Sequence, residues 1–199
     1  MKRKIFGLAI ILLLGSVMLI GCASDKGPAE QAVKAAEEAI NSTKAEAAKY
    51  VPDQVKSLES ALAAVKDKFA KGEYKAAISE AQALAGKAKG VVDAAKAKKE
   101  ELTKTWTNLN EGLPKMVEAI QSRVDILSQS KKLPANLTAE KFAEAKTGLA
   151  AAKEEWAKAL ENFKAGNYAD AVSVANSVKE KAVKAMETLG LPVPAGAKS

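Results

Sequence analysis

The chain has 199 residues, with 31 Lys and Arg residues against 24 Asp and Glu residues, one cysteine and no histidine. The missing histidine excludes His general bases, His metal ligands and the nucleophile arrangements that depend on histidine. We therefore expect no cofactor, no metal and no enzymatic activity, with an enzyme of unfamiliar type as a weaker alternative. The formal net charge is +7, and without the three basic residues at positions 2–4 it is 7 − 3 = +4, a mild excess spread along the chain that argues against a nucleic-acid partner.

Residues 1–21 have the order of regions of a secretory signal peptide. Basic residues occupy positions 2–4, and an apolar run follows over residues 5–20. A membrane-spanning helix needs about 20 apolar residues, and this run is shorter and ends at small residues. The sequence therefore predicts a signal peptide helix that is removed by cleavage.

The end of this run, Leu19-Ile20-Gly21-Cys22, resembles the lipobox of bacterial lipoproteins. In that family, signal peptidase II recognises the positions of Leu19 and Gly21 and cuts before a cysteine that carries a diacylglycerol. The resemblance implies that Cys22 is the lipidated first residue of the mature chain, attached to the membrane through acyl chains such as palmitate. The alternative is an ordinary secretory signal that happens to contain a cysteine.

The residue after the cysteine bears on the destination of such a lipoprotein. In Gram-negative lipoproteins, Asp at this place commonly causes retention in the inner membrane, whereas this chain has Ala23 followed by Ser24. The resemblance therefore implies the cell envelope, at the periplasmic face of the outer membrane if the cell is Gram-negative.

The remaining sequence predicts an all-α fold, because alanine, lysine, glutamate and leucine dominate and no segment alternates with period two. We expect an antiparallel bundle of about six helices. Their approximate ranges are 28–50, 53–71, 73–109, a fourth helix that follows Pro114 and includes residues 117–127, then 138–163 and 167–189. Gly112-Leu113-Pro114 is expected to separate the third helix from the fourth, and Gly86 and Gly90 to bend or loosen the third.

One decapeptide occurs twice. FAKGEYKAAI at residues 69–78 recurs as FKAGNYADAV at residues 163–172, an offset of 94. The apolar positions on both sides also match, so we predict one helical hairpin in two copies, over about residues 53–109 and 138–189. Glycine can adopt the left-handed conformation that ends a helix, while the flanking aromatic side chains pack across the turn. The predicted turn residues are Phe69, Gly72 and Tyr74 in the first copy, and Phe163, Gly166 and Tyr168 in the second.

The repeated spacing Phe-x-x-Gly-x-Tyr-x-x-Ala resembles the interhelix turn of tetratricopeptide repeats. The resemblance covers about ten residues per hairpin, and the offset of 94 differs from the repeat length of about 34 in that family. It implies a shared turn geometry, and a peptide-binding groove of the tetratricopeptide type remains an alternative. As a whole, the chain resembles alanine-rich helical envelope lipoproteins.

The predicted organisation has four parts: a signal peptide (1–21), a lipidated N-terminus with a short tether (22–28), a helical bundle domain (29–190) and a flexible tail (191–199). Trp106 and Trp156 fall on apolar stripes and are interpreted as core residues, and adjacent carboxylates such as Glu154 and Glu155 as solvated. We expect a structural or protein-interaction module with an unidentified envelope protein as partner. The alternative is a module that binds a small apolar or lipid ligand between the hairpins.

Overall fold

The structure is a computed structural model that describes residues 25–197, so the predictions for the signal peptide and for Leu19, Gly21 and Cys22 lie outside the described residues. The described part is all-helical, as predicted. Its elements are α1 (Lys26–Ala47), α2 (Pro52–Ala70), α3 (Tyr74–Gln129), α4 (Ala139–Lys164), α5 (Tyr168–Thr188) and a short 3-10 helix, η2 (Ala195–Ala197).

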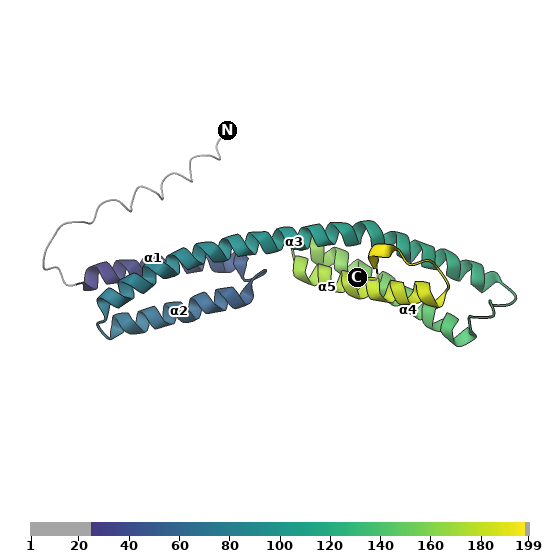
Figure 1. Ribbon diagram of the computed structural model, residues 1–199, viewed down its shortest axis with the longest axis horizontal. Coiled ribbons are helices and arrows are strands. Elements are labelled where there is room, and N and C mark those ends of the chain that lie inside the picture. The colour runs from purple at the N-terminus through teal and green to yellow at the C-terminus, as the bar shows by residue number, and fades with distance from the viewer. Residues whose placement is uncertain (1–24, 198–199) are drawn as a thin grey trace, which may run out of the picture.

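Helix α3 organises the molecule (Figure 1). Its 56 residues correspond to a length of about 84 Å at 1.5 Å per residue. Helices α1 and α2 lie along its first half, and α4 and α5 lie along its second half. Each half is an up-down-up arrangement of three helices, and α3 is the last helix of the first bundle and the first helix of the second.

The predicted single bundle over residues 29–190 is therefore divided into two hydrophobic cores. The first core ends on α3 at Ala95, and the second begins at Leu102. Buried residues recur on α3 at alternating steps of three and four, and the position between these two is Lys98, which forms an ion pair with Glu101 at 2.9 Å. A charged side chain at this one place in the apolar stripe leaves a turn of α3 without a buried residue and separates the cores.

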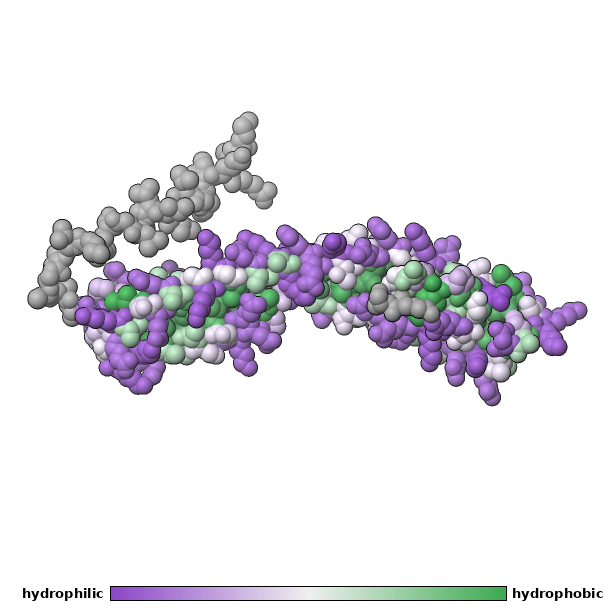
Figure 2. Space-filling model, in the orientation of Figure 1, coloured by the Kyte–Doolittle hydropathy of each residue, from purple (hydrophilic) through white to green (hydrophobic). Residues whose placement is uncertain are grey.

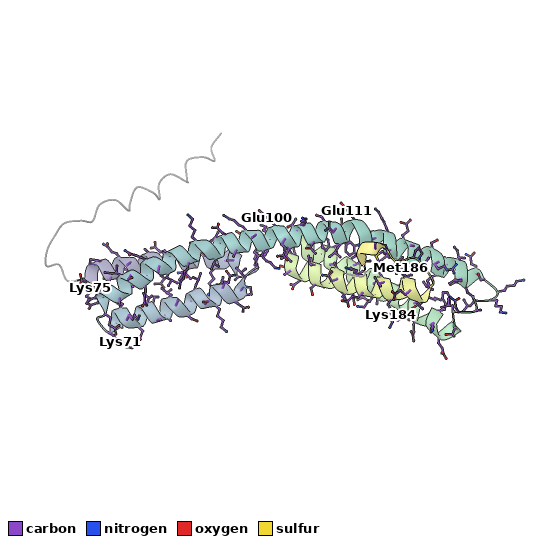
Figure 3. All side chains as sticks on the ribbon, viewed as in Figure 1. Lys71, Lys75, Glu100, Glu111, Lys184 and Met186 are labelled. Carbon is purple, nitrogen blue, oxygen red and sulfur yellow. The ribbon has the colours of Figure 1, made fainter. Side chains whose placement is uncertain are left out.

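The described helices number five rather than about six, because Gly112-Leu113-Pro114 does not end a helix. Pro114 lies inside α3, and Leu113 and Met116 beside it are 2% and 4% exposed. A proline inside a helix removes one backbone hydrogen bond and costs about 3 kcal/mol, which burial of the continuous stripe offsets. In Figures 1 and 3, α3 changes direction near the labelled Glu111, as expected close to a proline.

The glycines in the first half of α3 do not interrupt it either. Gly86 and Gly90 lie in continuous α-helix, where the sequence had predicted a bend or a loosened turn. Leu84, Ala88 and Val91 remain buried on the same face. Tertiary packing of this face outweighs the cost of about 1 kcal/mol that each glycine imposes on a helix.

Small residues determine how closely α4 and α5 approach each other. Ala145, Ala152 and Ala159 of α4 are at most 3% exposed, whereas Phe163 and Trp156, the latter predicted as a core residue, are only half-buried. On the face shown in Figure 2, hydrophilic side chains cover most of the outer surface, and apolar residues lie mainly in the furrows between helices. The alanines are therefore the fully buried residues of α4, while the rings of Trp156 and Phe163 stack on Trp106 of α3.

Candidate functional site

Acidic side chains are the candidate metal ligands and acid–base groups of the described residues. Residues 25–197 contain no cluster of three or more Cys, Asp or Glu side chains that could hold a metal ion. The adjacent carboxylates of Glu154 and Glu155 are directed to different partners, Lys158 at 2.7 Å and Lys181 at 2.8 Å. Within the same range, no helix has the length and apolar character needed to cross a membrane. The candidate binding surfaces are therefore the repeated turns, the junction between the two bundles and the grooves between helices.

The two repeated turns have the same backbone geometry. Gly72 and Gly166 have φ of 80° and 81°, in the left-handed region, and each lies two residues after the last residue of its helix, α2 or α4. In the first turn, the amide of Gly72 donates to the Phe69 carbonyl at 3.1 Å and the amide of Glu73 to the Lys68 carbonyl at 3.0 Å. The second turn repeats this pattern, which is the Schellman motif.

The surroundings of the two turns differ. The turn at Gly72 lies at one end of the molecule, and the turn at Gly166 lies near its middle (Figure 1). Phe69 packs edge to face on Tyr74 with ring centroids 5.5 Å apart, whereas Phe163 stacks on Trp106 at 4.5 Å. The second copy of the turn is therefore joined to α3 by aromatic contacts, while the first is closed mainly by its own tyrosine.

The second turn also forms part of the junction between the two bundles. Tyr50, in the loop after α1, stacks on Tyr168 with ring centroids 6.4 Å apart. The Lys99 ammonium lies 6.0 Å from the Tyr50 ring centroid and 5.9 Å from that of Tyr168, and it donates to Glu46 at 3.4 Å. The hydrogen bond to Glu46 and the field of the two phenols raise the pKa of Lys99.

Aromatic rings continue from this junction into the second core. Tyr168 packs on Phe163 at 4.9 Å, Phe163 stacks on Trp106, and Trp106 stacks on Trp156 at 5.3 Å. Trp106 is 5% exposed, which confirms its interpretation as a core residue. The rings connect α3, α4 and α5 to the loop of the first bundle and brace the junction.

A groove of about 570 Å³ separates α3 from α5, and the C-terminal segment lies against it. Gly190, with φ of 69°, ends α5 in a third left-handed turn and reverses the chain. Leu191 and Val193 then pack on the second core, and the groove is lined by Leu109, Gly112, Leu113, Met116 and Pro194, among others. Part of the segment predicted as a flexible tail thus has defined contacts in the structure.

A second groove of about 570 Å³ runs between α4 and α5. Its floor consists of small residues, including Ala145, Gly148 and Ala185. Glu144 lines it on α4 and Lys184 lines it on α5. Figure 3 shows Lys184 on the side of α5 away from α3, so this groove lies on an outer face of the second bundle.

Sequence reasoning missed Tyr50 and Lys99 as members of a junction. The sequence did contain a signal, because the regular spacing of apolar residues on α3 is interrupted at Lys98 and resumes at Leu102. This interruption marks the boundary between the two cores. At such a boundary a cationic residue can contact both bundles. The partners of Lys99 come from distant parts of the chain, and sequence spacing gives no indication of them.

Comparisons with known proteins give no relative on which to base a function. No protein-family model, no curated protein and no solved structure matches the chain.

Proposed function

We propose that the chain is a bacterial envelope lipoprotein that acts as a lipid-anchored structural rod and protein-interaction module. The observation that carries the proposal is the elongated shape built on α3. Helix α1 starts only four residues after Cys22 and lies at the end that carries the Gly72 turn, while loop 130–138 lies at the opposite end (Figure 1). A lipid on Cys22 therefore attaches one end of a rod about 84 Å long.

The resemblance of residues 19–22 to a lipobox supports the anchor. Leu19 and Gly21 are the recognition positions for signal peptidase II, and Cys22 is the only residue of the chain that can form the thioether. With Ala23 after the cysteine, the proposed location is the periplasmic face of the outer membrane in a Gram-negative cell. The protein partner is an envelope protein bound by the second bundle, which the anchor holds away from the membrane.

The absence of histidine supports a non-enzymatic role. We also propose that α2 with the first part of α3, and α4 with α5, are two copies of one hairpin. The same pattern of backbone hydrogen bonds at Gly72 and Gly166 supports this duplication. In a repeat of about 34 residues both helices fit within that length, whereas α4 alone has 26 residues, so the turn is the shared feature rather than the tetratricopeptide superhelix.

The experiment for this proposal follows fatty-acid labelling of the full-length chain in cells. The parent chain is expected to incorporate labelled palmitate and to be shortened by its leader, whereas Cys22→Ser remains unlabelled and at precursor size. Ser24→Ala, two residues away, is the matched control and should be processed like the parent. Label on the Cys22→Ser variant, or none on the parent, would contradict the anchor.

A second candidate function is the binding of a small apolar or lipid ligand. The groove between α3 and α5 favours it, because Leu109, Leu113 and Met116 line it beneath a short C-terminal segment. Native mass spectrometry of the purified chain, with and without residues 191–199, distinguishes this function from the rod. A copurified lipid that depends on this segment supports ligand binding, and a bare chain in both forms argues against it.

A further inference from the structure

The outer groove between α4 and α5 has walls of opposite charge. Glu140 and Glu144 of α4 line it, as do Lys181 and Lys184 of α5. Between these walls the groove is lined by alanine, glycine and threonine residues.

The charges at one end of this groove lack intramolecular partners. Lys181 forms an ion pair with Glu155 across α4 and α5 at 2.8 Å. Nearer the start of α4, no ion pair within the described chain involves Glu140, Glu144 or Lys184. The groove thus presents unpaired carboxylates on one side and an unpaired ammonium on the other, with an apolar strip between them.

We propose that this face binds a second copy of the chain. A twofold axis parallel to α4 and α5 places α4 of each copy over α5 of the other. Because rotation about such an axis keeps the height along the helices, Glu144 of one copy then lies within about a turn of Lys184 of the second copy, and the reverse contact forms by symmetry. The same face is complementary to itself, which is the requirement for an isologous dimer.

This arrangement also determines the relative direction of the two molecules. Rotation about an axis along the rod leaves both copies parallel, with both N-termini at the same end. The two chains are then able to attach to one membrane, although the dimer does not depend on the lipid. The face is narrow, so we expect a weak, reversible dimer, which confinement to a membrane would strengthen by raising the effective concentration.

The test uses the full-length chain in a mild detergent and sedimentation equilibrium in a solvent of matched density, so that only protein mass is measured. The parent is expected to show a concentration-dependent dimer. Glu144→Lys or Lys184→Glu places like charges opposite each other twice per dimer and should weaken association at least tenfold. The double variant Glu144→Lys with Lys184→Glu exchanges the two charges and should restore dimerisation.

Glu118→Lys is the matched control, because Glu118 is an exposed, unpaired carboxylate on α3 outside this groove. It should dimerise like the parent. Far-ultraviolet circular dichroism verifies that each variant is helical, and the neutral variants Glu144→Gln and Lys184→Gln decide the matter if a charge reversal unfolds the chain. A parent that stays monomeric at every concentration, or a dimer that ignores these substitutions, would overturn the proposal.

Discussion

Tyr50 and Tyr168 stack at 22° between ring planes, although one lies in the loop between α1 and α2 of the first bundle and the other begins α5 of the second. The Lys99 ammonium lies close to both rings. Apart from α3 itself, this contact joins two bundles that have separate cores. We therefore expect the junction to affect how rigidly the two halves of the rod are aligned.

Removing the junction should loosen that alignment. We expect Tyr50→Ala, and more weakly Lys99→Ala, to broaden the distance distribution between spin labels placed at positions 71 and 132, because α3 alone then resists bending. Lys104→Ala, which removes an exposed lysine of α3 outside the junction, is the control and should leave the distribution unchanged. Identical distributions in all variants would mean that α3 is stiff without the stacked tyrosines.

Alanine should have opposite effects at two kinds of glycine. Gly72 has positive φ, so Gly72→Ala should lower the free energy of unfolding by about 1 kcal/mol, and Gly72→Val by about 1 to 2 kcal/mol. Gly86 lies within α3, and a Cβ there meets no atom within 4 Å, so Gly86→Ala should raise it by up to about 1 kcal/mol. Urea unfolding of the chain from Ala23 onward measures both.

Gly166→Val provides the second copy of this test and should resemble Gly72→Val. The interpretation of the repeat fails if the valine variants are as stable as the parent. The glycine contrast fails if Gly86→Ala destabilises as much as Gly72→Ala.

The two phenylalanines of the repeat should not be equally important. Phe163 contacts both Trp106 and Tyr168, whereas the ring contact of Phe69 is with Tyr74. Since both are half-buried, we expect Phe163→Ala to cost about 3 kcal/mol and Phe69→Ala about 1 to 2 kcal/mol. Thermal unfolding followed by tryptophan fluorescence gives both values, and equal losses would show that the ring contacts around Trp106 add no stability.

The ion pair between α4 and α5 predicts a dependence on acid pH. The hydrogen bond from Lys181 lowers the pKa of Glu155 below its ordinary value of 4.5. A depressed carboxyl pKa contributes stability above the unfolded pKa, and this contribution is lost as the pH falls through the folded pKa. The parent should therefore lose more unfolding free energy than Glu155→Gln when the pH falls from about 5 to about 3.

Glu118→Gln serves as the control in this titration, because it removes a carboxylate that has no ion pair. Its unfolding free energy should follow the parent across the same range. The role of Lys181 is contradicted if the Glu155→Gln and parent curves remain parallel at every pH.

Helix content and the ends of most helices were predictable from the sequence. Alanine-rich apolar stripes and glycine at helix ends are local signals, which involve only a few neighbouring residues. The start of α4 is an example of such a local interaction, since the amide of Lys141 donates to the side-chain oxygen of Thr138, three residues earlier, at 3.2 Å. Pro114 was misjudged because a local rule predicts a break, while burial of Leu113 and Met116 against distant helices keeps α3 continuous. The number of helices thus depends on packing that the local sequence does not reveal.

The candidate surfaces were less predictable than the helices. The repeated turns were found because glycine and aromatic spacing is a local signal. The junction depends on Tyr50, Lys99 and Tyr168, whose proximity follows from how α3 is shared between the bundles. The outer groove between α4 and α5 could not be predicted, because the sequence does not show which faces of these helices remain uncovered.

Energy transfer from single positions on the rod to a membrane tests the lipid-anchored rod most directly. Donor dyes are attached at Lys71→Cys, Glu100→Cys and Lys132→Cys in the lipidated chain, bound to vesicles that contain an acceptor on the lipid headgroups. In Figure 3, Lys71 lies at the end where α1 starts and Glu100 lies near the middle, while residue 132 belongs to loop 130–138 at the other end. We predict strong transfer from position 71, weaker transfer from position 100 and almost none from position 132, and equal transfer from all three positions would contradict the lipid-anchored rod.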